Sequence, residues 1–215
     1  MRFDFYRHPM IGLFGGTFDP IHIGHVNTVS SVKRKLALDH VLVVPANIPP
    51  HRSSPIVSSE HRLAMVHLAT EGVPGFKCDD REIQRGGVSY MILTLRELRR
   101  ELGDRSLCVI LGLDSFLDLP LWHQWTEILE KAHIVVMQRP GWSIPSTLPG
   151  WWKEANQASI DALHAQPHGF VYHLSVPNFD VTSTNIRRRL ARFLGKEHGL
   201  SPRVLEYIRL HGLYD

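Results

Sequence analysis

Short, almost wholly apolar runs recur along the chain, and segments with helical spacing of their apolar residues lie between them. The runs that predict buried strands are 10–14, 40–44, 107–111 and 133–137. Continuous apolar runs of this length are typical of parallel strands that are buried on both faces. Their alternation with helices predicts an α/β fold, built on a single doubly wound, mostly parallel sheet with helices on both faces.

The other predicted elements are distributed around these strands. Helices are expected over 21–38, 58–70, 89–102, 122–131 and 182–194 and from Ser201-Pro202 onward, with further strands over 76–83 and 170–176. Ser58, Ser89 and Ser201 are expected to cap their helices. Residues 140–168, rich in Pro, Gly, Trp and His, are expected to form an irregular excursion with one short helix near 151–165. We expect one domain over 10–215, preceded by an N-terminal extension over 1–9.

The composition is that of an ordinary globular protein, with 43% hydrophobic and 21% charged residues among 215. No apolar run reaches about 18 residues, so no membrane span is expected. The first nine residues lack the apolar core of a secretory signal. Cys78 and Cys108 stand alone, which favours small core residues in a reducing compartment. The sequence therefore predicts a cytoplasmic protein.

Basic residues gather in three clusters, at 33–35, 96–100 and 187–189, although the formal net charge is only +3. The first two clusters lie on predicted helices and are interpreted as solvated helix faces. A basic surface can bind nucleic acid, but it can equally serve small phosphorylated ligands. We expect phosphorylated ligands here, and neither nucleic acid nor a membrane as a partner.

The most informative stretch joins the first predicted strand to the following helix: Gly15-Gly16-Thr17-Phe18-Asp19-Pro20-Ile21-His22-Ile23-Gly24-His25. Glycines let a backbone turn tightly and approach a ligand closely. A helix that begins near Ile21 would direct free N–H groups and its positive dipole end at that approach. His22 and His25 would share one face of its first turn. Together these features predict a phosphate-binding site.

Each part of this motif also has a plainer explanation. Two glycines after a strand are often only a turn, and one histidine on a helix is usually a solvated or core residue. The ungapped combination favours a site over both. The motif is not a Walker A loop, because no Gly-Lys-Ser/Thr follows, and it is not the Gly-x-Gly-x-x-Gly dinucleotide fingerprint.

Further segments place suitable side chains after strands or at helix starts. Pro49-Pro50-His51-Arg52 is a stiffened loop that ends in two groups able to be cationic. Asp114 follows Gly112 at a strand end, where a carboxylate could hold a ribose or orient a ring. Trp122 offers a flat face for stacking a base or a pyridinium ring, whereas Trp125 is expected in the core.

Two arginine-bearing segments suit phosphates. Arg139 ends the strand at 133–138 with a guanidinium. Thr182-Ser183-Thr184-Asn185-Ile186-Arg187 begins a helix with hydroxyls and adds an arginine one turn later. Helix N–H groups, hydroxyls and an arginine fork suit a triphosphate. Hydroxyl residues are also common helix caps, and the two roles can coexist.

Read in order, these motifs resemble one family. They are Gly-Gly-Thr-Phe-Asp-Pro-Ile-His-x-Gly-His, Pro-Pro-His-Arg, Ser89-Tyr90, Gly-x-Asp-Ser, Leu-Pro-x-Trp, Val-Val-x-x-Arg-Pro-Gly, Ser-Thr-x-Ile-Arg and Tyr-Ile-x-x-x-Gly-Leu-Tyr. The chain resembles the bacterial nicotinate-nucleotide adenylyltransferases of the HxGH nucleotidyltransferase superfamily over about residues 10–215, most weakly over 142–172. After Ser89-Tyr90 the family usually has Thr-x-Asp-Thr, whereas this chain has Met91-Ile92-Leu93-Thr94. Residues 181–184 read Val-Thr-Ser-Thr where Ile-Ser-Ser-Thr is commoner.

The resemblance implies a Rossmann-like nucleotidyltransferase that transfers the adenylyl group of ATP to nicotinate mononucleotide in NAD biosynthesis, giving deamido-NAD and pyrophosphate. Mg²⁺ would accompany ATP, held mainly by phosphates and water and not by a closed protein cage. The implied residues are His22, His25 and Thr17 for catalysis; Gly15, Gly16, Phe18, Arg52, Gly112, Asp114, Ser183, Thr184 and Arg187 for ATP and phosphate; and Ser89, Trp122, His123 and Arg139 for the pyridine nucleotide.

Alternative interpretations differ in substrate or in class. Adenylyl or cytidylyl transfer to nicotinamide mononucleotide or phosphopantetheine would keep the chemistry and change the acceptor. A non-catalytic nucleotide- or RNA-binding module would use the basic helices and would bind nucleic acid with a strong salt dependence. The intact histidine pair argues against such a module. The sequence leaves open nicotinate against nicotinamide, and a monomer against a homo-oligomer.

Overall fold

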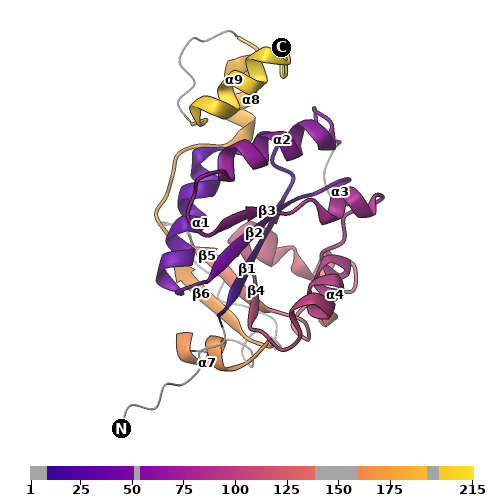
Figure 1. Cartoon of the computed structure of the whole chain (residues 1–215), viewed down its shortest axis with the longest axis vertical. Helices are drawn as coiled ribbons and strands as arrows, with labels where there is room; N and C mark the ends of the chain where they lie inside the picture. The colour runs from indigo at the N-terminus through magenta and orange to yellow at the C-terminus, as the bar shows by residue number, and fades with distance from the viewer. Residues whose placement is uncertain (1–8, 51–53, 139–158, 193–198) are drawn as a thin grey trace.

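The computed structural model describes residues 9–50, 54–138, 159–192 and 199–215, which form a six-stranded sheet with helices around it (Figure 1). The strands are β1 Ile11–Gly16, β2 His40–Pro45, β3 Phe76–Cys78, β4 Leu107–Gly112, β5 His133–Gln138 and β6 Val171–Ser175. Their order is β3-β2-β1-β4-β5-β6, and each neighbouring pair is parallel. The predicted α/β class and parallel sheet are confirmed.

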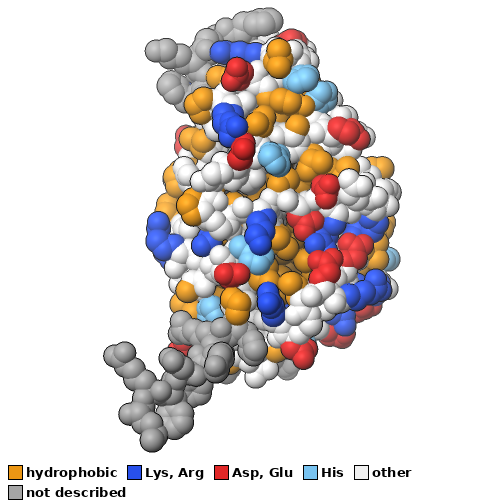
Figure 2. All heavy atoms as spheres, in the orientation of Figure 1, with side chains coloured by type: hydrophobic (Ala, Val, Ile, Leu, Met, Phe, Trp, Pro, Cys, Tyr) orange, Lys and Arg blue, Asp and Glu red, His pale blue; other side chains and the backbone are white. Residues whose placement is uncertain are grey.

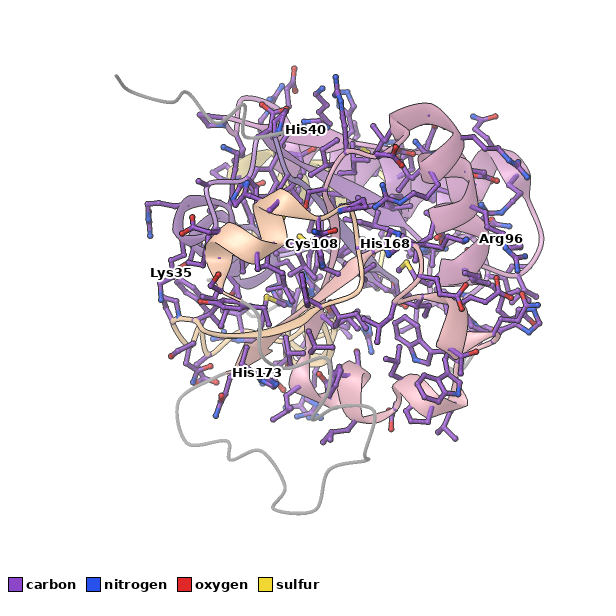
Figure 3. The ribbon with its side chains drawn as sticks, turned by 90° about the horizontal axis from the view of Figure 1, so that it is seen from below. Lys35, His40, Arg96, Cys108, His168 and His173 are labelled. Atoms are coloured by element: carbon purple, nitrogen blue, oxygen red, sulfur yellow. The ribbon has the colours of Figure 1, made fainter. Side chains whose placement is uncertain are left out.

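Helices cover both faces of this sheet, as predicted. They are α1 Ile23–Lys35, α2 Ser59–Thr70, α3 Arg81–Arg85, α4 Met91–Leu102, α5 Leu113–Leu117, α7 Ile160–Ala165, α8 Ser183–Leu190 and α9 Pro202–Leu210, with short 3-10 turns η1 Leu119–Leu121 and η2 Trp125–Glu127. Apolar residues of α1, α2, α7, α8 and α9 belong to one core cluster, and those of α4 and α5 belong to the other. Lys35 of α1 and Arg96 of α4 accordingly project from opposite sides of the molecule (Figure 3).

The central strand β1 is packed from both faces. Met10 and Phe14 join the cluster on the α1 side, whereas Ile11 and Leu13 join the cluster on the α4 side. This alternation is the period of two that an extended chain imposes on its side chains. The strands β2 and β3 lie on one side of β1, and β4, β5 and β6 lie on its other side. The direction in which successive strands are added to the sheet therefore reverses between β1 and β4. In folds of this kind, ligands bind outside the carboxyl ends of the strands at such a reversal.

The predicted strand over 76–83 is wrong beyond Cys78. The side-chain carboxylate of Asp79 accepts a hydrogen bond from the backbone N–H of Arg81 at 3.1 Å and also pairs with the Arg81 guanidinium at 2.7 Å. Such local bonds from an aspartate offer the backbone an alternative to the ladder of a sheet. The chain therefore leaves the sheet and forms α3.

Two predicted helices end early or do not form. The segment 122–131 forms only η2 and turns, because Gln124 adopts a left-handed backbone with φ 51° that interrupts a helix. Helix α8 ends at Leu190, short of the predicted residue 194. The short helix expected within 151–165 is present as α7, while 139–158 lie outside the described residues.

Charged side chains of both signs are interleaved around α3 and α4 (Figure 2). Arg96 lies 2.7 Å from Glu127, and Arg85 lies 2.9 Å from Glu97. Arg99 donates to backbone carbonyls, among them those of Lys131 and Pro167. The basic cluster at 96–100 is thus partly neutralised on the surface. Across the described ranges, no helix is long and apolar enough to cross a membrane.

Candidate active site

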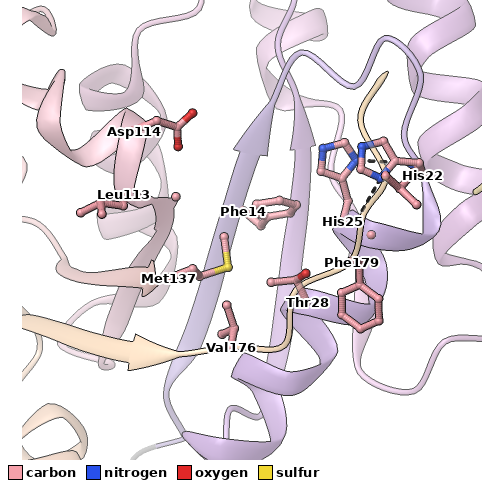
Figure 4. Close-up of a pocket in the computed structure, with 12 residues that line it drawn as sticks. Phe14, His22, His25, Thr28, Leu113, Asp114, Met137, Val176 and Phe179 are labelled. Carbon is pink, nitrogen blue, oxygen red and sulfur yellow. Dashed lines mark hydrogen bonds between the residues drawn. The ribbon is translucent and has the colours of Figure 1, made fainter. Parts of the chain in front are cut away.

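A cavity of about 150 Å³ opens at the carboxyl ends of β1 and β4 (Figure 4). Its walls come from the β1–α1 connection, the start of α5, the end of β5 and the segment after β6, and include Phe14, His22, His25, Gly112, Asp114, Met137 and Phe179. Figure 4 places the two histidines on one side of the cavity and Asp114 on the other, with Phe14 between them. The cavity lies at the reversal of strand order, where the fold predicts a ligand site.

The two glycines are the last residues of β1, where the sequence predicted a turn. Gly15 and Gly16 pair with Val44 and Pro45 of β2, and the chain turns only after them. A Cβ on Gly16 would lie 2.9 Å from the ring of Phe18, and one on Gly15 would lie 3.1 Å from the methyl group of Met91. The glycines therefore leave room for these neighbouring side chains. The turn itself contains Phe18 with φ 52° and a cis peptide bond before Pro20.

The histidine pair caps the first turn of α1. The helix begins at Ile23, two residues later than predicted, and His22 is its N-cap. The backbone N–H of His25 donates to His22 Nδ1 at 3.3 Å, and the backbone N–H of His22 donates to His25 Nδ1 at 3.2 Å. The two rings stack with centroids 3.6 Å apart. This reciprocal arrangement is a capping box made by two imidazoles.

The capping box also determines where each neutral imidazole carries its proton. A nitrogen that accepts a hydrogen bond must be unprotonated, and both Nδ1 atoms accept from backbone N–H groups. The neutral form of each ring is therefore protonated at Nε2. The rings of Phe18 and His25 meet nearly at right angles, with centroids 5.3 Å apart, so that Phe18 supports the His25 ring from one side.

Gly24 explains the spacing between the histidines. A Cβ at this position would lie 3.0 Å from His22 Nδ1 and 3.1 Å from its Cε1. Both distances are shorter than ordinary van der Waals contacts, so a larger residue would push against the ring. His22 itself is only 7% exposed and has little room to move.

Residues of α8 reach the loop between β1 and α1, as the predicted site requires. The Ser183 hydroxyl donates to the carbonyl of Pro20 at 3.0 Å, and Arg187 Nη1 donates to the carbonyl of Asp19 at 2.6 Å. Thr184 Oγ1 accepts a weaker bond from Arg187 Nη2 at 3.4 Å. These side chains therefore lie beside the loop 17–22, which is called the histidine loop below. Their binding of phosphates stays a prediction.

Gly112 and Asp114 lie where the sequence placed them, at the end of β4 and the start of α5. Both line the cavity, and the Asp114 side chain is exposed. A Cβ on Gly112 would lie 2.5 Å from Asp114 Oδ1, so glycine leaves the carboxylate its place. Thr17 begins the loop, and its carbonyl accepts a bond from Arg62.

Three of the predicted pyridine residues, Ser89, Trp122 and His123, do not line this cavity. Trp122, like Trp125, is half-buried and packs against the core on the α4 side. The ring of His123 lies 4.4 Å from that of Tyr90, at the start of α4. Ser89 does not cap α4 as predicted, because its hydroxyl accepts instead from the backbone N–H of Asn47 at 2.8 Å. Arg52 and Arg139, which were also predicted to bind ligands, lie outside the described residues.

The segment that departs from the family pattern contributes to the core around α4. Met91 packs on Gly15 and on the α4-side cluster. Thr94, which keeps the family's residue, donates its hydroxyl to buried Glu82 at 2.6 Å. Burial raises the pKa of the Glu82 carboxyl, and the hydrogen bonds of Thr94 and Ser89 oppose that rise. The network joins α3 to α4, and Ser89 connects it to Asn47 in the loop after β2.

Arg62 and Tyr214 are two residues that motif analysis missed as parts of the site. Arg62 of α2 is 1% exposed and donates to the carbonyls of Thr17, Ala46 and Asn47 at 2.8, 2.5 and 2.8 Å. Burial lowers its pKa, and the charge of Asp19 partly opposes this effect. No sequence pattern marks an arginine in a helix as buried. Tyr214 belongs to the Tyr-Ile-x-x-x-Gly-Leu-Tyr motif, to which no role was given.

Comparisons with known proteins give the family of this chain. The sequence matches the model of the cytidylyltransferase-like family over residues 13–189. A "Probable nicotinate-nucleotide adenylyltransferase" of Aeromonas hydrophila is 44% identical over 208 residues, 96% of this chain and 97% of the relative. A protein of the same name from Methylococcus capsulatus is 42% identical, covering 95% of this chain and 99% of the relative.

The fold is shared with a more distant solved structure. It is the Plasmodium falciparum nicotinic acid mononucleotide adenylyltransferase complexed with NaAD, with a TM-score of 0.70, 17% identity, and coverage of 97% of this chain and 98% of the other. At this identity the likeness supports the fold alone. The sequence identities of 44% and 42% over nearly the whole chain decide the family: this chain belongs to the nicotinate-nucleotide adenylyltransferases.

Proposed function

We propose that this chain transfers the adenylyl group of ATP to nicotinate mononucleotide, giving deamido-NAD and pyrophosphate. The observation that carries the proposal is the stacked pair His22 and His25 at the start of α1, in the cavity where the strand order reverses. Family membership supplies the two substrates. The chemistry follows from the donors that surround the cavity.

The reaction needs positioning and charge neutralisation more than it needs a base. An oxygen of the mononucleotide phosphate attacks the α-phosphorus of ATP, the bond from that phosphorus to the α–β bridging oxygen breaks, and pyrophosphate leaves with the bonding electrons. The phosphate is already a nucleophile, so no proton has to be removed. In-line placement and stabilisation of charge on the α-phosphoryl oxygens then account for the acceleration.

The histidine pair is suited to that task. Because Nδ1 of each ring accepts from the backbone, Nε2–H is the donor that each neutral ring can present to an α-phosphoryl oxygen. Thr17 and the N–H groups that follow β1 would add further donors. Ser183, Thr184 and Arg187 would face the β and γ phosphates, with Arg52 as a further cation.

Mg²⁺ fits this cavity as a companion of ATP. The donors at the cavity are imidazoles and the Asp114 carboxylate, and no cluster of three metal-ligating side chains occurs among the described residues. Such a set suits an ion that keeps its waters and binds mostly to substrate phosphates, and Asp114 would be the carboxylate that accepts from those waters. The bound ion would offset part of the triphosphate charge.

The acceptor would extend from the cavity toward the start of α4. Trp122, His123, Ser89 and Arg139 remain our candidates for holding its pyridine ring and carboxylate. Met91 stands where the family usually has threonine, so any contact of that hydroxyl is replaced here by an apolar group. We also propose that the protein works on small molecules in a reducing cytoplasm, which accords with the free thiols of Cys78 and Cys108.

The test is pyrophosphate release with ATP and Mg²⁺, with nicotinate mononucleotide, nicotinamide mononucleotide or phosphopantetheine supplied in parallel. Release with nicotinate mononucleotide alone would support the whole proposal. Release with phosphopantetheine would keep the chemistry and overturn the pyridine substrate, and silence with all three would favour a binding module.

The histidine pair can be tested separately from the acceptor. We expect His22→Ala and His25→Ala each to lower turnover by about 10²-fold or more, because each removes a donor at the developing charge. The measurement is steady-state release of pyrophosphate from variants with unchanged circular dichroism. Near-normal turnover in both variants would overturn the phosphate role of the pair.

A further inference from the structure

We infer that Asp19 and Tyr214 together position the histidine pair, although neither residue lines the cavity. The inference rests on the proposed function, because it concerns the same site. Asp19 lies in the loop three positions before His22, while Tyr214 follows α9. Their side chains meet across 195 positions of sequence, where the Tyr214 hydroxyl donates to Asp19 Oδ1 at 2.8 Å.

The Asp19 carboxylate is held at both of its oxygens. Oδ1 accepts from Tyr214, and Oδ2 accepts from the backbone N–H of Ile56 at 2.9 Å. The Asp19 side chain is nearly buried, with the residue only 7% exposed. Losing one donor would leave a buried charged oxygen without its partner, which is costly in a protein interior. The carboxylate therefore fixes the loop from within.

Other distant donors hold the backbone of the same loop. The carbonyls of Thr17, Asp19 and Pro20 accept from Arg62, Arg187 and Ser183, respectively. These donors come from α2 and α8. The loop that ends in His22 is thus oriented by side chains from separate parts of the chain, with Tyr214 as the donor to its carboxylate.

The Tyr214 side chain is itself firmly placed. The residue is 7% exposed, and its backbone is left-handed, with φ 69°, a conformation that a tyrosine keeps only when its surroundings hold it. Burial, together with the bond to Asp19, raises the pKa of the phenol. The hydroxyl therefore stays protonated and remains a donor to the carboxylate throughout the pH range in which the protein would work.

The variant that isolates this bond is Tyr214→Phe, which keeps the ring and removes the hydroxyl. We expect kcat to fall about tenfold, because small misplacements of catalytic groups are expensive in rate. KM for ATP should stay within about twofold, since the donors to the triphosphate remain. A purely structural role would lower the unfolding temperature and leave kcat unchanged.

The matched control is Tyr207→Phe, which removes a hydroxyl that hydrogen-bonds His61 Nδ1 at 3.0 Å between α9 and α2. This bond does not involve the histidine loop, so kcat should not change. Asp19→Asn should lower kcat further than Tyr214→Phe, and the two changes combined should cost less than their separate effects multiplied. Independent, multiplicative losses would contradict a shared bond.

A second readout does not depend on activity. Imidazole ¹⁵N spectra should show shifted or broadened signals of His22 and His25 in Tyr214→Phe, and unchanged signals of this pair in Tyr207→Phe. If the native protein released no pyrophosphate with any acceptor, the proposed function would fail while this spectral test still decided the positioning role. Unchanged signals of the pair in Tyr214→Phe would overturn it.

Discussion

Gly24 shows how a missing side chain can control the geometry of its neighbours. In Gly24→Ala, the new methyl group would press on His22 at about the 3.0 Å contact with Nδ1. We expect kcat to fall by about tenfold or more, because the ring must move from its capping position. The free energy of unfolding should change little, since the higher helix propensity of alanine offsets the loss of the His22 cap.

Steady-state kinetics and thermal unfolding of Gly24→Ala would separate these two effects. Asn27→Ala is the matched control, because Asn27 is exposed on the same helix and its replacement also raises helix propensity. Normal turnover in Gly24→Ala would mean that the position of the His22 ring is unimportant. A large loss of stability would instead point to damage in α1.

Arg62 joins helix α2 to the loops that follow β1 and β2. Its guanidinium donates to four carbonyls on those loops, those of Thr17, Ala46, Asn47 and Val57, because it presents several donors in one plane. Lysine carries the charge but offers donors from a single point. We expect Arg62→Lys to lower the free energy of unfolding by about 3 kcal/mol, since at least two buried carbonyls lose their partner.

Urea unfolding of Arg62→Lys measures this loss directly. The exposed Arg100 of α4 provides the control, and Arg100→Lys should leave the unfolding midpoint where it is in the native protein. Equal midpoints for the two variants would show that the carbonyl contacts of Arg62 contribute little.

His133 links β5 to the segment that leads into β6, and it makes stability depend on pH. The side chain is fully buried; Nε2 hydrogen-bonds the carbonyl of Gln166, and Nδ1 accepts from the N–H of Phe170. Burial lowers its pKa from 6.5 to about 4. The unfolded chain therefore binds a proton at higher pH than the folded protein. The contribution of the neutral His133 to the free energy of unfolding is fully present above pH 6.5 and is lost as the pH falls toward 4.

The variant His133→Gln tests this linkage, because glutamine can donate to Gln166 without titrating. Between about pH 7 and about pH 5, the free energy of unfolding should fall by about 2 kcal/mol more in the native protein than in the variant. Urea unfolding at the two pH values gives the difference. If the native protein and the variant differed in free energy of unfolding by the same amount at both pH values, the assigned role of the buried imidazole would be contradicted.

Elements with a strong, uniform pattern were predictable from the sequence. The apolar runs at β1, β2, β4 and β5 predicted parallel strands because burial on both faces leaves no polar alternation. The pattern failed where one local bond decides the path, as with Asp79 before α3, or one backbone angle, as with Gln124 before η2. Single hydrogen bonds and left-handed residues leave no periodic trace in a sequence.

For the chain as a whole, the motif from Gly15 to His25 predicted where the cavity lies. It did not predict the distant side chains that hold the motif in place. His22, His25 and Asp114 were predictable because the motif is contiguous or follows a strand end. Arg62 and Tyr214 lie far from the motif in sequence, and ordinary patterns do not mark a buried donor. The contacts of Ser89 were also beyond prediction, because its partner Asn47 lies 42 positions away on another loop.

The reactivity of the two thiols measures how well the interior around them is shielded from solvent. Cys108 lies inside the sheet (Figure 3), and burial raises its pKa to about 12. Burial and the charges of Asp80 and Asp79 raise the pKa of Cys78 to about 11. Because the thiolate is the reactive form, both should react slowly with a disulfide reagent in the native protein and rapidly in denaturant. Rapid native labelling of Cys108 would contradict the packing of β4.

The strand order described above has a consequence for how quickly the site can assemble. Ile11 of β1 pairs with His40, 29 positions later, and also with Leu107, 96 positions later. Closing the longer loop costs about 1 kcal/mol more chain entropy, so the β1–β2 pair is favoured to form first. The cavity borders the later pair. A refolding chain would therefore acquire nucleotide affinity only after the two halves of the sheet have joined, and ligand binding would mark a late step of folding.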